Sequence, residues 1–358
     1  MSQATAIANS NAGLAPNSYI YKVISTGPRQ DPLTYSKLDR LAIISSDDSL
    51  RFLDPQTLNP TPDGIVKNAN EKVTCLERAN DTSGNVVATA GRDGFIRFWD
   101  KRTSQKALEI ESPHKLISAL VCDAEKNSIA AGIENPDDGP GVSPVYVCTD
   151  GLINLFDTSQ AEEDDALYQV INHRSAIAHA GFMYPGTNIY ALGTDETMSF
   201  YALQSQKEEE EEPTPKAFGD VREPLGCEYL VDMHWVGSQP FIAAGKHSRL
   251  DLIPITKASG SPLQYDYDPG KSIQLPGGHG EEIVRDLFTD VHTRTTYTCG
   301  EDGHIRAWKL SSTTEETMDI DEPPSPTKKK SKDKDRKERR KEKKEKRRGE
   351  DQARYKPY

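Results

Sequence analysis

The sequence has few cysteines and no long apolar run. Its five cysteines are an odd number, lie far apart and include no C-x-x-C pair, so the pattern is typical of a reducing compartment and argues against a disulfide framework or a zinc site. No apolar stretch approaches the roughly 20 residues that a membrane-spanning helix needs. Residues 1–16 are polar and uncharged, and they are expected to form a disordered leader instead of a secretory signal. These features argue against a membrane or secreted protein.

Motifs for catalysis are also missing. The sequence contains no G-x-S-x-G elbow, no P-loop, no H-E-x-x-H pair and no glycine-rich dinucleotide turn. The eight histidines are dispersed along the chain. We therefore expect no catalytic residues, no cofactor and no metal site. An enzyme would need convergent polar residues that the sequence does not reveal.

Charge is distributed very unevenly along the chain. Residues 328–348 carry 15 Lys and Arg against 5 Asp and Glu, a net charge of +10. Residues 1–327 carry 27 basic and 49 acidic residues, a net charge of −22. The overall charge of −12 hides this division into an acidic body and a basic tail. Such an acidic body attracts basic partners, with a rate that depends on salt.

The C-terminal segment 311–358 is expected to be disordered, because no apolar periodicity continues beyond residue 310. Its basic run resembles nuclear localisation signals, which predicts a nuclear import receptor as a partner. The clusters concerned are Lys328, Lys329, Lys330, Arg339, Arg340, Lys341, Arg347 and Arg348. Two alternatives stay open: a solubilising tail, and contact with RNA or DNA. No aromatic residue interrupts the run, so nucleic acid would be bound through its phosphates, without sequence preference.

Ser325 precedes a proline and lies just before this basic run. The short pattern Ser325-Pro326-Thr327-Lys328 resembles a site for proline-directed kinases. A phosphate there would add a charge of about −2 beside the Lys and Arg residues. We expect it to weaken import or phosphate binding by the tail.

One sequence unit recurs through the body: a short apolar strand, an acidic turn and an alternating strand that ends in an aromatic residue and often Asp. The six copies are LAIISSDDSLRFLD (41–54), VVATAGRDGFIRFWD (86–100), VYVCTDGLINLFD (145–157), IYALGTDETMSFYAL (189–203), FIAAGKHSRLDLIPI (241–255) and TYTCGEDGHIRAWKL (296–310). Asp-Gly and Asp-Asp in several of the turns tolerate the positive φ of tight hairpins. Five further apolar stretches, 73–79, 116–123, 176–183, 229–236 and 283–290, fit an additional inner strand beside each hairpin. The spacing predicts an all-β propeller over residues 17–310.

Polar residues at fixed places in these units resemble the hydrogen-bonded tetrad of WD repeats. The last unit has all four members, His279, Thr298, Asp302 and Trp308. Partial sets are Thr89, Asp93 and Trp99, which lack an evident histidine, and His173 and Asp195, which are followed by Tyr201 in place of tryptophan. The aspartates of the turns, Asp48, Asp93, Asp150, Asp195 and Asp302, are interpreted as turn and tetrad scaffolding rather than as general acids.

The likeness extends to the WD repeat-containing protein 89 family, including its fungal members. It is carried by AAGIENPDDG (130–139), DGLINLFDTSQAEEDDAL (150–167), DVREPLGCEYLVDMHWVG (220–237), GGHGEEIVRDLF (277–288) and the terminal RYKPY (354–358). The resemblance implies a seven-bladed WD40 propeller, whereas six hairpins are visible. About one blade's worth of sequence is missing near residues 133–145. Either the protein has lost a blade or the gene model has skipped an exon; we favour the second, since losing a blade would require the ring to close again.

The sequence thus predicts a non-catalytic WD-repeat protein that acts as a protein–protein interaction scaffold, in the nucleus, with the cytoplasm left open as a second location. The alternative is an RNA- or chromatin-associated factor that binds through its basic tail, with a role in ribosome biogenesis or related to histones. A propeller enzyme is a second and more remote alternative. The residues identify neither the partners nor the binding face. We further expect Ser18 to Ser25 to close the ring as the outer strand of the last blade.

Overall fold

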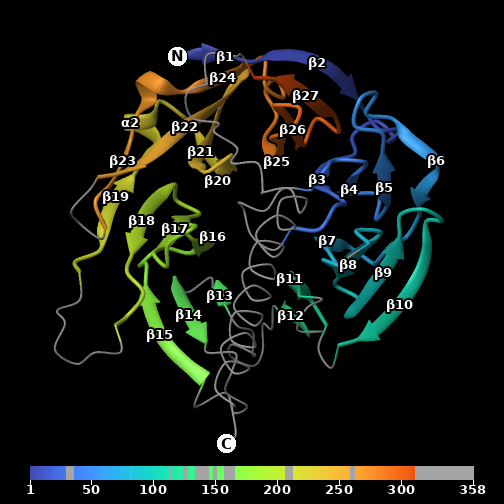
Figure 1. Cartoon of the computed structure of the whole chain (residues 1–358), viewed down its shortest axis with the longest axis horizontal. Helices are drawn as coiled ribbons and strands as arrows, with labels where there is room; N and C mark the ends of the chain where they lie inside the picture. The colour runs from blue at the N-terminus through green and yellow to red at the C-terminus, as the bar shows by residue number, and fades with distance from the viewer. Residues whose placement is uncertain are drawn as a thin grey trace, which may run out of the picture. The chain divides into compact units, whose positions relative to one another are not determined.

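In the computed structural model the chain consists of β-strands with almost no helix. The structure describes residues 1–310 except 30–35, 82, 113–114, 124–127, 134–144, 148–150, 157–165, 206–212 and 259–262. The described residues form seven sheets, numbered here 1 to 7 in chain order, and all lie in one compact unit, Met1–Thr317. Figure 1 shows the sheets of this unit arranged around a common centre. This arrangement is the predicted propeller architecture, and the number of sheets is compatible with the seven-blade template.

Four sheets have four antiparallel strands each. Sheet 1 contains β3 (Ile20–Ser25), β4 (Leu41–Ser45), β5 (Leu50–Leu53) and β6 (Pro60–Val66). Sheet 2 contains β7 (Val73–Arg78), β8 (Val86–Gly91), β9 (Phe95–Asp100) and β10 (Gln105–Glu111). Sheet 5 contains β16 (Ile177–Phe182), β17 (Ile189–Gly193), β18 (Thr197–Tyr201) and β19 (Lys216–Asp220). Sheet 7 contains β25 (Val284–Asp290), β26 (Thr295–Gly300), β27 (Ile305–Lys309) and β2 (Thr5–Ser10).

Sheet 6 is larger, and sheets 3 and 4 are smaller. Sheet 6 contains β20 (Tyr229–Val236), β21 (Gln239–Lys246), β22 (Arg249–Lys257), β23 (Tyr265–Tyr267), β24 (Ile273–Pro276) and β1 (Ser2–Gln3). Sheet 3 has only β11 (Ile117–Asp123) and β12 (Ser128–Ile133), and sheet 4 has β13 (Val145–Val147), β14 (Leu152–Phe156) and β15 (Leu167–Asn172). Two short helices, α2 (Arg222–Leu225) and η1 (Pro269–Lys271), lie in connections. Sheets 3 and 4 are thus the incomplete ones in the described part of the chain, and they flank the region where the sequence appeared short.

The predicted hairpins and inner strands are confirmed. Each of the six sequence units forms an antiparallel pair, such as β8 with β9 and β26 with β27. The five additional apolar stretches form β7, β11, β16, β20 and β25. Their Val, Ile, Phe and Thr residues suit a pleated, half-buried surface, and the tight turns between them include residues with positive φ, such as Asp48 and Gly303.

The hydrophobic core is divided among the contacts between neighbouring sheets. One cluster joins sheets 7 and 1 through residues such as Tyr297 and Val23, and another joins sheets 5 and 6 through Phe200 and Trp235. Further clusters join sheet 1 to sheet 2, sheet 2 to sheet 3 and sheet 4 to sheet 5. Both faces of sheets 1, 2 and 5 are therefore covered by their neighbours, as in a radial stack.

The N-terminal segment differs from its prediction as a disordered leader. Residues Ser2–Gln3 pair in parallel with β24 of sheet 6, and Thr5–Ser10 pair with β27 of sheet 7. The outer strand of the last sheet is therefore β2, and the prediction that Ser18 to Ser25 would fill this place was wrong. That segment forms β3, the inner strand of sheet 1, since Ile20, Val23 and Ile24 are buried there. The strand Thr5–Ser10 lacks this signal because it is largely exposed and is held through its backbone.

Within the described residues, no helix combines the length and the apolar character that crossing a membrane requires.

Candidate interaction site: polar turns and inner strands

Four polar side chains of sheet 7 form one continuous chain of hydrogen bonds. The indole Nε1 of Trp308 donates to Oγ1 of Thr298 at 2.9 Å, and this oxygen lies 2.8 Å from Nε2 of His279. The other ring nitrogen, Nδ1, lies 2.7 Å from Oδ1 of Asp302. The structure thus brings together all four residues that the sequence singled out as a tetrad.

The tetrad of sheet 7 works with a neutral imidazole. Burial lowers the pKa of His279, although the Asp302 carboxylate opposes this effect. A neutral ring can donate from Nδ1 to Asp302 while Nε2 accepts from the Thr298 hydroxyl, which leaves each group with a partner. Burial alone would raise the pKa of Asp302, but hydrogen bonds from His279 and Arg306 and the backbone amide of His304 outweigh it and lower the pKa to about 2. The carboxylate is therefore ionised and fixed at neutral pH.

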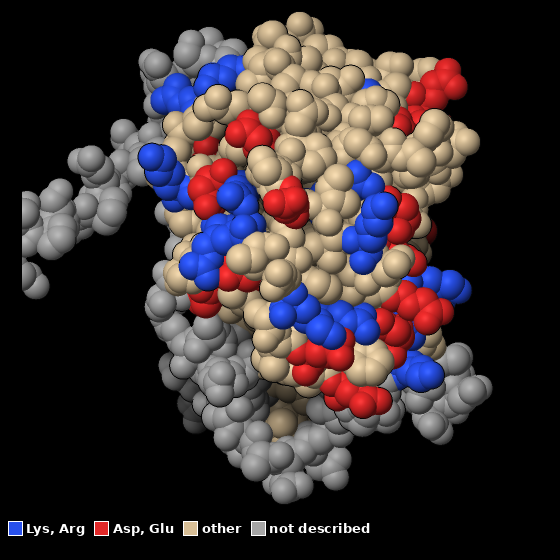
Figure 2. Space-filling view, turned by 90° about the vertical axis from the view of Figure 1, so that its right-hand side faces the viewer, with Lys and Arg blue, Asp and Glu red and all other residues tan. Residues whose placement is uncertain are grey.

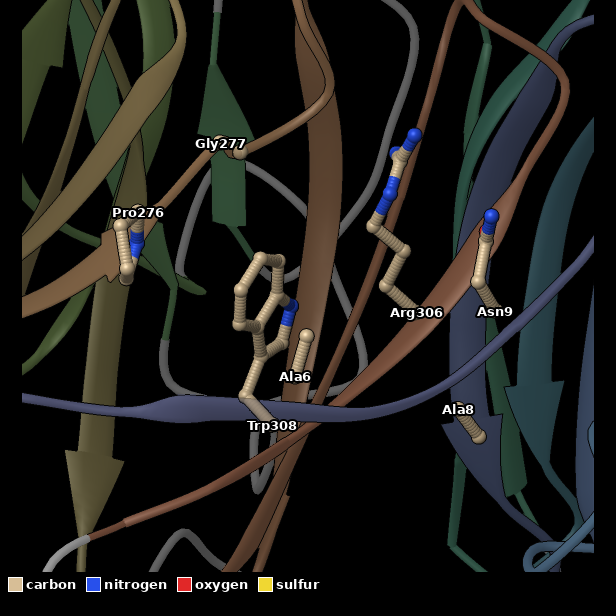
Figure 3. A pocket seen from close by; sticks show the side chains of 8 residues that line it. Ala6, Ala8, Asn9, Pro276, Gly277, Arg306 and Trp308 are labelled. Carbon is tan, nitrogen blue, oxygen red and sulfur yellow. The ribbon is translucent and has the colours of Figure 1, made fainter.

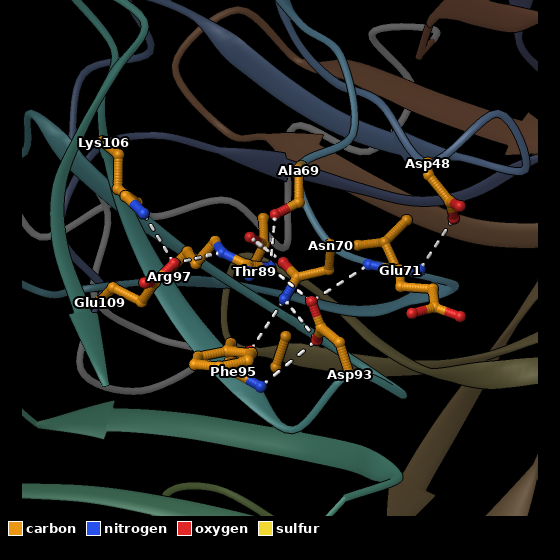
Figure 4. Close-up of polar contacts among 12 residues, drawn as sticks. Asp48, Ala69, Asn70, Glu71, Thr89, Asp93, Phe95, Arg97, Lys106 and Glu109 are labelled. Atoms are coloured by element: carbon orange, nitrogen blue, oxygen red, sulfur yellow. Dashed lines mark hydrogen bonds and ion pairs between the residues drawn. The ribbon is translucent and has the colours of Figure 1, made fainter. Parts of the chain in front are cut away.

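Sheet 2 contains the same arrangement with an asparagine in place of the histidine (Figure 4). Trp99 donates to Thr89 at 2.8 Å, and Thr89 donates to Oδ1 of Asn70 at 2.7 Å. The amide nitrogen of Asn70 then donates to Oδ1 of Asp93 at 3.0 Å. Like a neutral imidazole, the amide accepts on one side and donates on the other. Sequence reasoning missed Asn70, although it lies 19 residues before Thr89, the separation that also relates His279 to Thr298.

Sheet 5 has a rearranged version of the tetrad. Nε2 of His173 lies 3.0 Å from Oγ1 of Thr197, which donates to Oδ1 of Asp195 at 2.8 Å. Nδ1 of His173 lies 3.0 Å from the hydroxyl of Tyr201. Ala191 occupies the place that Thr298 has in sheet 7, so no hydroxyl is available there and the phenol contacts the histidine directly. The predicted His173 and Asp195 are thus linked through Thr197 and not by a direct bond.

A second motif repeats beside the tetrads. In sheets 1, 2 and 7 the turn aspartate pairs with an arginine four residues later. The pairs are Asp47–Arg51 at 2.7 Å, Asp93–Arg97 at 2.5 Å and Asp302–Arg306 at 2.6 Å. In sheet 1 this aspartate is Asp47 and not Asp48, which the sequence had indicated. Asp150 lies outside the described residues.

Asp48 instead connects two sheets. Its Oδ1 accepts from the backbone amide of Val73, the first residue of β7, at 3.0 Å. Glu196, in the turn of sheet 5, makes the equivalent contact with the amide of Leu230 at the start of β20, at 2.6 Å. Asp286 differs because it lies on the inner strand β25, and it accepts from the amide of Val23 in the middle of β3 at 2.8 Å. Since hydrogen bonds to a charged acceptor are the stronger kind, all three carboxylates hold an inner strand against the preceding sheet.

The inner strands bring charged residues together near the centre. Six of them, β3, β7, β11, β16, β20 and β25, have a register shift at the same place, just after the first residues of the strand. The residues that follow the shift include Lys22, His179, Asp232 and Asp286. Nζ of Lys22 lies 2.7 Å from Glu77, and Nδ1 of His179 lies 3.6 Å from Asp232.

The pKa values of this central group reflect its enclosure by several strands. Burial raises the pKa of Asp286 to about 6, even though Lys22 and backbone amides oppose it. Burial alone would lower the pKa of Lys22, but the carboxylates of Glu77 and Asp286 outweigh it and raise that pKa. The positive charge of Lys22 and the negative charges of Glu77 and Asp286 offset one another, which indicates a structural polar network.

A shallow groove lies between the N-terminal strand and the loop after β24 (Figure 3). Its volume is about 410 Å³. It is lined by Ala6, Ala8, Asn9, Pro276, Gly277, Gly278, Arg306 and Trp308. Trp308 and Arg306 are engaged in the tetrad and in the pair with Asp302, so the groove borders the polar turn but adds no further reactive group.

The outer strands of sheets 1 and 2 face solvent with both signs of charge. Figure 2 shows basic and acidic side chains interspersed on this side of the molecule. Glu109 on β10 lies 2.7 Å from Arg97 and also 2.7 Å from Lys106. The basic and acidic charges on this side therefore offset one another locally, in contrast to the net negative charge of the body.

No group of three or more His, Cys, Asp or Glu side chains is placed to hold a metal ion in the part of the chain that the structure describes. The tail clusters from Lys328 to Arg348 and the candidate phosphorylation site Ser325 lie outside that part. Their interpretation stays a prediction.

Comparison with known proteins agrees with the fold. A family model described as "WD domain, G-beta repeat" matches residues 63–100, which include β7, β8 and β9. An uncharacterized WD repeat-containing protein of Saccharomyces cerevisiae is 32% identical over 266 residues, which are 64% of this chain and 65% of the yeast protein. A WD repeat-containing protein 89 homolog of Dictyostelium discoideum is 22% identical over 277 residues, which are 68% of this chain and 74% of that protein. The chain thus spans less than two thirds of the yeast relative.

Among solved structures, the β-propeller domain of Cps50 (Swd1) from Myceliophteria thermophila is similar with a TM-score of 0.49 and 12% identity, covering 82% of this chain and all of that one.

The radial sheets, the tetrads and the family match support one class for the molecule, that of WD-repeat β-propeller proteins. Within that class, its sequence is similar to the WD repeat-containing protein 89 homolog of Dictyostelium discoideum.

Proposed function

We propose that this chain is a non-catalytic scaffold of the nucleus, which binds basic segments of partner proteins on its acidic propeller and reaches the nucleus through its basic tail. WD-repeat proteins are generally protein-interaction scaffolds. The observation that carries the finer proposal is the division of charge, −22 over residues 1–327 against +10 over residues 328–348. An acidic body selects basic partners, whereas a basic run without aromatic residues suits an import receptor.

The geometry of the turns supports binding on the propeller face that carries them. The tetrads and the Asp–Arg pairs fix the turns with bonds between buried or half-buried groups. Loops fixed in this way lose little conformational entropy when a partner binds, which favours affinity. Glu71 and Glu282 are exposed on this face, each two residues before an inner strand. They are suitable contacts for a basic segment.

Affinity purification of the tagged chain, with and without residues 328–348, tests this proposal. A scaffold keeps its co-purifying proteins after the deletion and loses only its nuclear location. A deletion of residues 311–327 is the matched control, since it shortens the tail but keeps the basic run. If loss of 328–348 instead abolishes a salt-sensitive association with RNA or DNA and leaves no protein partner, the alternative of a nucleic-acid factor is correct.

A further inference from the structure

Arg78, the last residue of β7, is a cation that the described residues leave without an ion pair. Its Nη2 donates to the hydroxyl of Ser25 at 3.2 Å, and its guanidinium carbon lies 6.0 Å from the centre of the Phe288 ring. Its Nε is buried and has no hydrogen-bond partner. Burying a charged donor without an acceptor costs free energy, so the site lacks an anion.

The nearest carboxylates do not fill this place. Glu77, the preceding residue, is paired with Lys22 at 2.7 Å. Asp286 accepts from the backbone amides of Val23 and Leu287, both at 2.8 Å. These two acids are close enough to affect the ionisation of Arg78, but their oxygens are directed to other donors.

Arg29 adds a second positive charge near Arg78. Burial, against the opposing charge of Glu77, lowers the pKa of Arg78 to about 10, and the charge of Arg29 adds to this lowering. Arg29 also contributes to the low pKa of His234 on β20, where burial is the main cause. The charge of Arg29 thus acts on side chains of both β7 and β20 and adds to the positive charge near Arg78.

We propose that Arg78, with Ser25 and Phe288 around it, forms a binding site for a carboxylate group. The guanidinium plane offers the free Nε–H together with an Nη–H, a pair of donors that matches the two oxygens of a carboxylate. The Ser25 hydroxyl holds the guanidinium in place, and the Phe288 ring borders the group.

A carboxylate fits this site better than a phosphate. Glu77 and Asp286 place negative charge nearby, and a doubly charged phosphate is repelled about twice as strongly as a singly charged carboxylate at the same distance. The partner chemistry is therefore an acidic side chain or a chain terminus, in contrast to the basic segments proposed for the turn face.

The resonance of the Arg78 Nε–H group measures this binding directly. The full chain, labelled with ¹⁵N-arginine, is titrated with sodium acetate and in parallel with inorganic phosphate, at an ionic strength held constant with sodium chloride. The signal is identified by its loss in Arg78→Lys. If that variant does not fold, the displacement of the signal in Ser25→Ala identifies it. We expect a saturable shift with acetate, a smaller one with phosphate and none with chloride alone.

A thermal unfolding series gives an independent reading. Acetate is expected to raise the midpoint of the wild-type chain relative to chloride, and Arg78→Gln is expected to weaken acetate binding about tenfold or more. Arg102→Gln is the matched control, because Arg102 is exposed and paired with Asp100 at 2.5 Å. A shift of all arginine signals together, no shift of Arg78, or a stronger effect of phosphate than of acetate would overturn the proposal.

Discussion

In sheets 2 and 7 the same three contacts are made by different side chains. Asn70 and His279 each accept from a threonine hydroxyl and donate to the aspartate of the turn. The requirement at this position is thus a buried group with one donor and one acceptor on opposite sides. Because asparagine meets this requirement as well as histidine does, the sequence pattern with histidine is complete in sheet 7 and not in sheet 2.

Asn70→Ala is predicted to destabilise the protein by about 1–3 kcal/mol, because it leaves Thr89 and Asp93 with unsatisfied groups. Asn70→His should recover part of this loss, since the imidazole restores both contacts. Urea unfolding of the two variants and the wild type measures the difference. Equal stability of Asn70→Ala and the wild type would contradict the role given to Asn70.

The lowered pKa of Asp302 predicts a dependence of stability on pH. Because its pKa is about 2 in the fold and 3.8 ordinarily, its contribution is fully present above about pH 4 and is lost as the pH falls towards 2. A shift of this size corresponds to about 2 kcal/mol. Unfolding free energies of the wild type and Asp302→Asn, measured from pH 5 to pH 2.5, should converge as the pH falls. A constant difference across this range would show that the carboxylate charge does not contribute.

At the scale of single elements, the turn between β26 and β27 depends on a glycine. Gly303 has a φ of +71°, and a Cβ atom there would lie 2.3 Å from the carbonyl oxygen of Ser18. The turn therefore needs both the positive φ and the absence of a side chain, because the segment leading to β3 passes against it.

Gly303→Ala is predicted to cost clearly more than the roughly 1 kcal/mol that alanine costs at positive φ alone. Gly237→Ala is the matched control, since Gly237 also has a positive φ, +61°, but nothing lies within 4 Å of its would-be Cβ. Chemical denaturation of both variants provides the comparison. If the two substitutions cost the same, the contact with Ser18 is unimportant.

Strong apolar character made most strands predictable, and weak apolar character hid the rest. The hairpins and inner strands were found because their Val, Ile and Phe residues are buried between sheets. The strand Thr5–Ser10 was missed because its residues are mostly exposed and its partner, β27, binds its backbone. Likewise, Asp47 and Asp48 are adjacent and chemically equal, so only the register of β4 and β5 decides which one pairs with Arg51.

Removal of residues 2–10 is predicted to expose the edge of β27 and to leave Trp308 without its neighbour Ala6. Exposed edges promote association between molecules, so we expect a lower midpoint of thermal unfolding and concentration-dependent aggregation. Scanning calorimetry and light scattering measure these effects. Unchanged stability and solubility after the deletion would mean that β2 does not close sheet 7.

At the scale of the whole molecule, the proposed function depends on where partners bind. The acidic propeller and the basic tail are separate in sequence and opposite in charge, so their contributions can be altered one at a time. The exposed acids Glu71 and Glu282 are on the turn face, whereas Asp63 and Asp266 are exposed on the strands β6 and β23.

The most direct measurement is quantitative recovery of partner proteins from nuclear extract by the chain without residues 328–348. With Glu71→Lys and Glu282→Lys introduced together, recovery should fall several-fold at unchanged thermal stability, because two attractive charges become repulsive. With Asp63→Lys and Asp266→Lys it should stay at the level of the unmodified propeller. Equal recovery by all three proteins, or no recovery by any chain that lacks the tail, would contradict binding on the turn face.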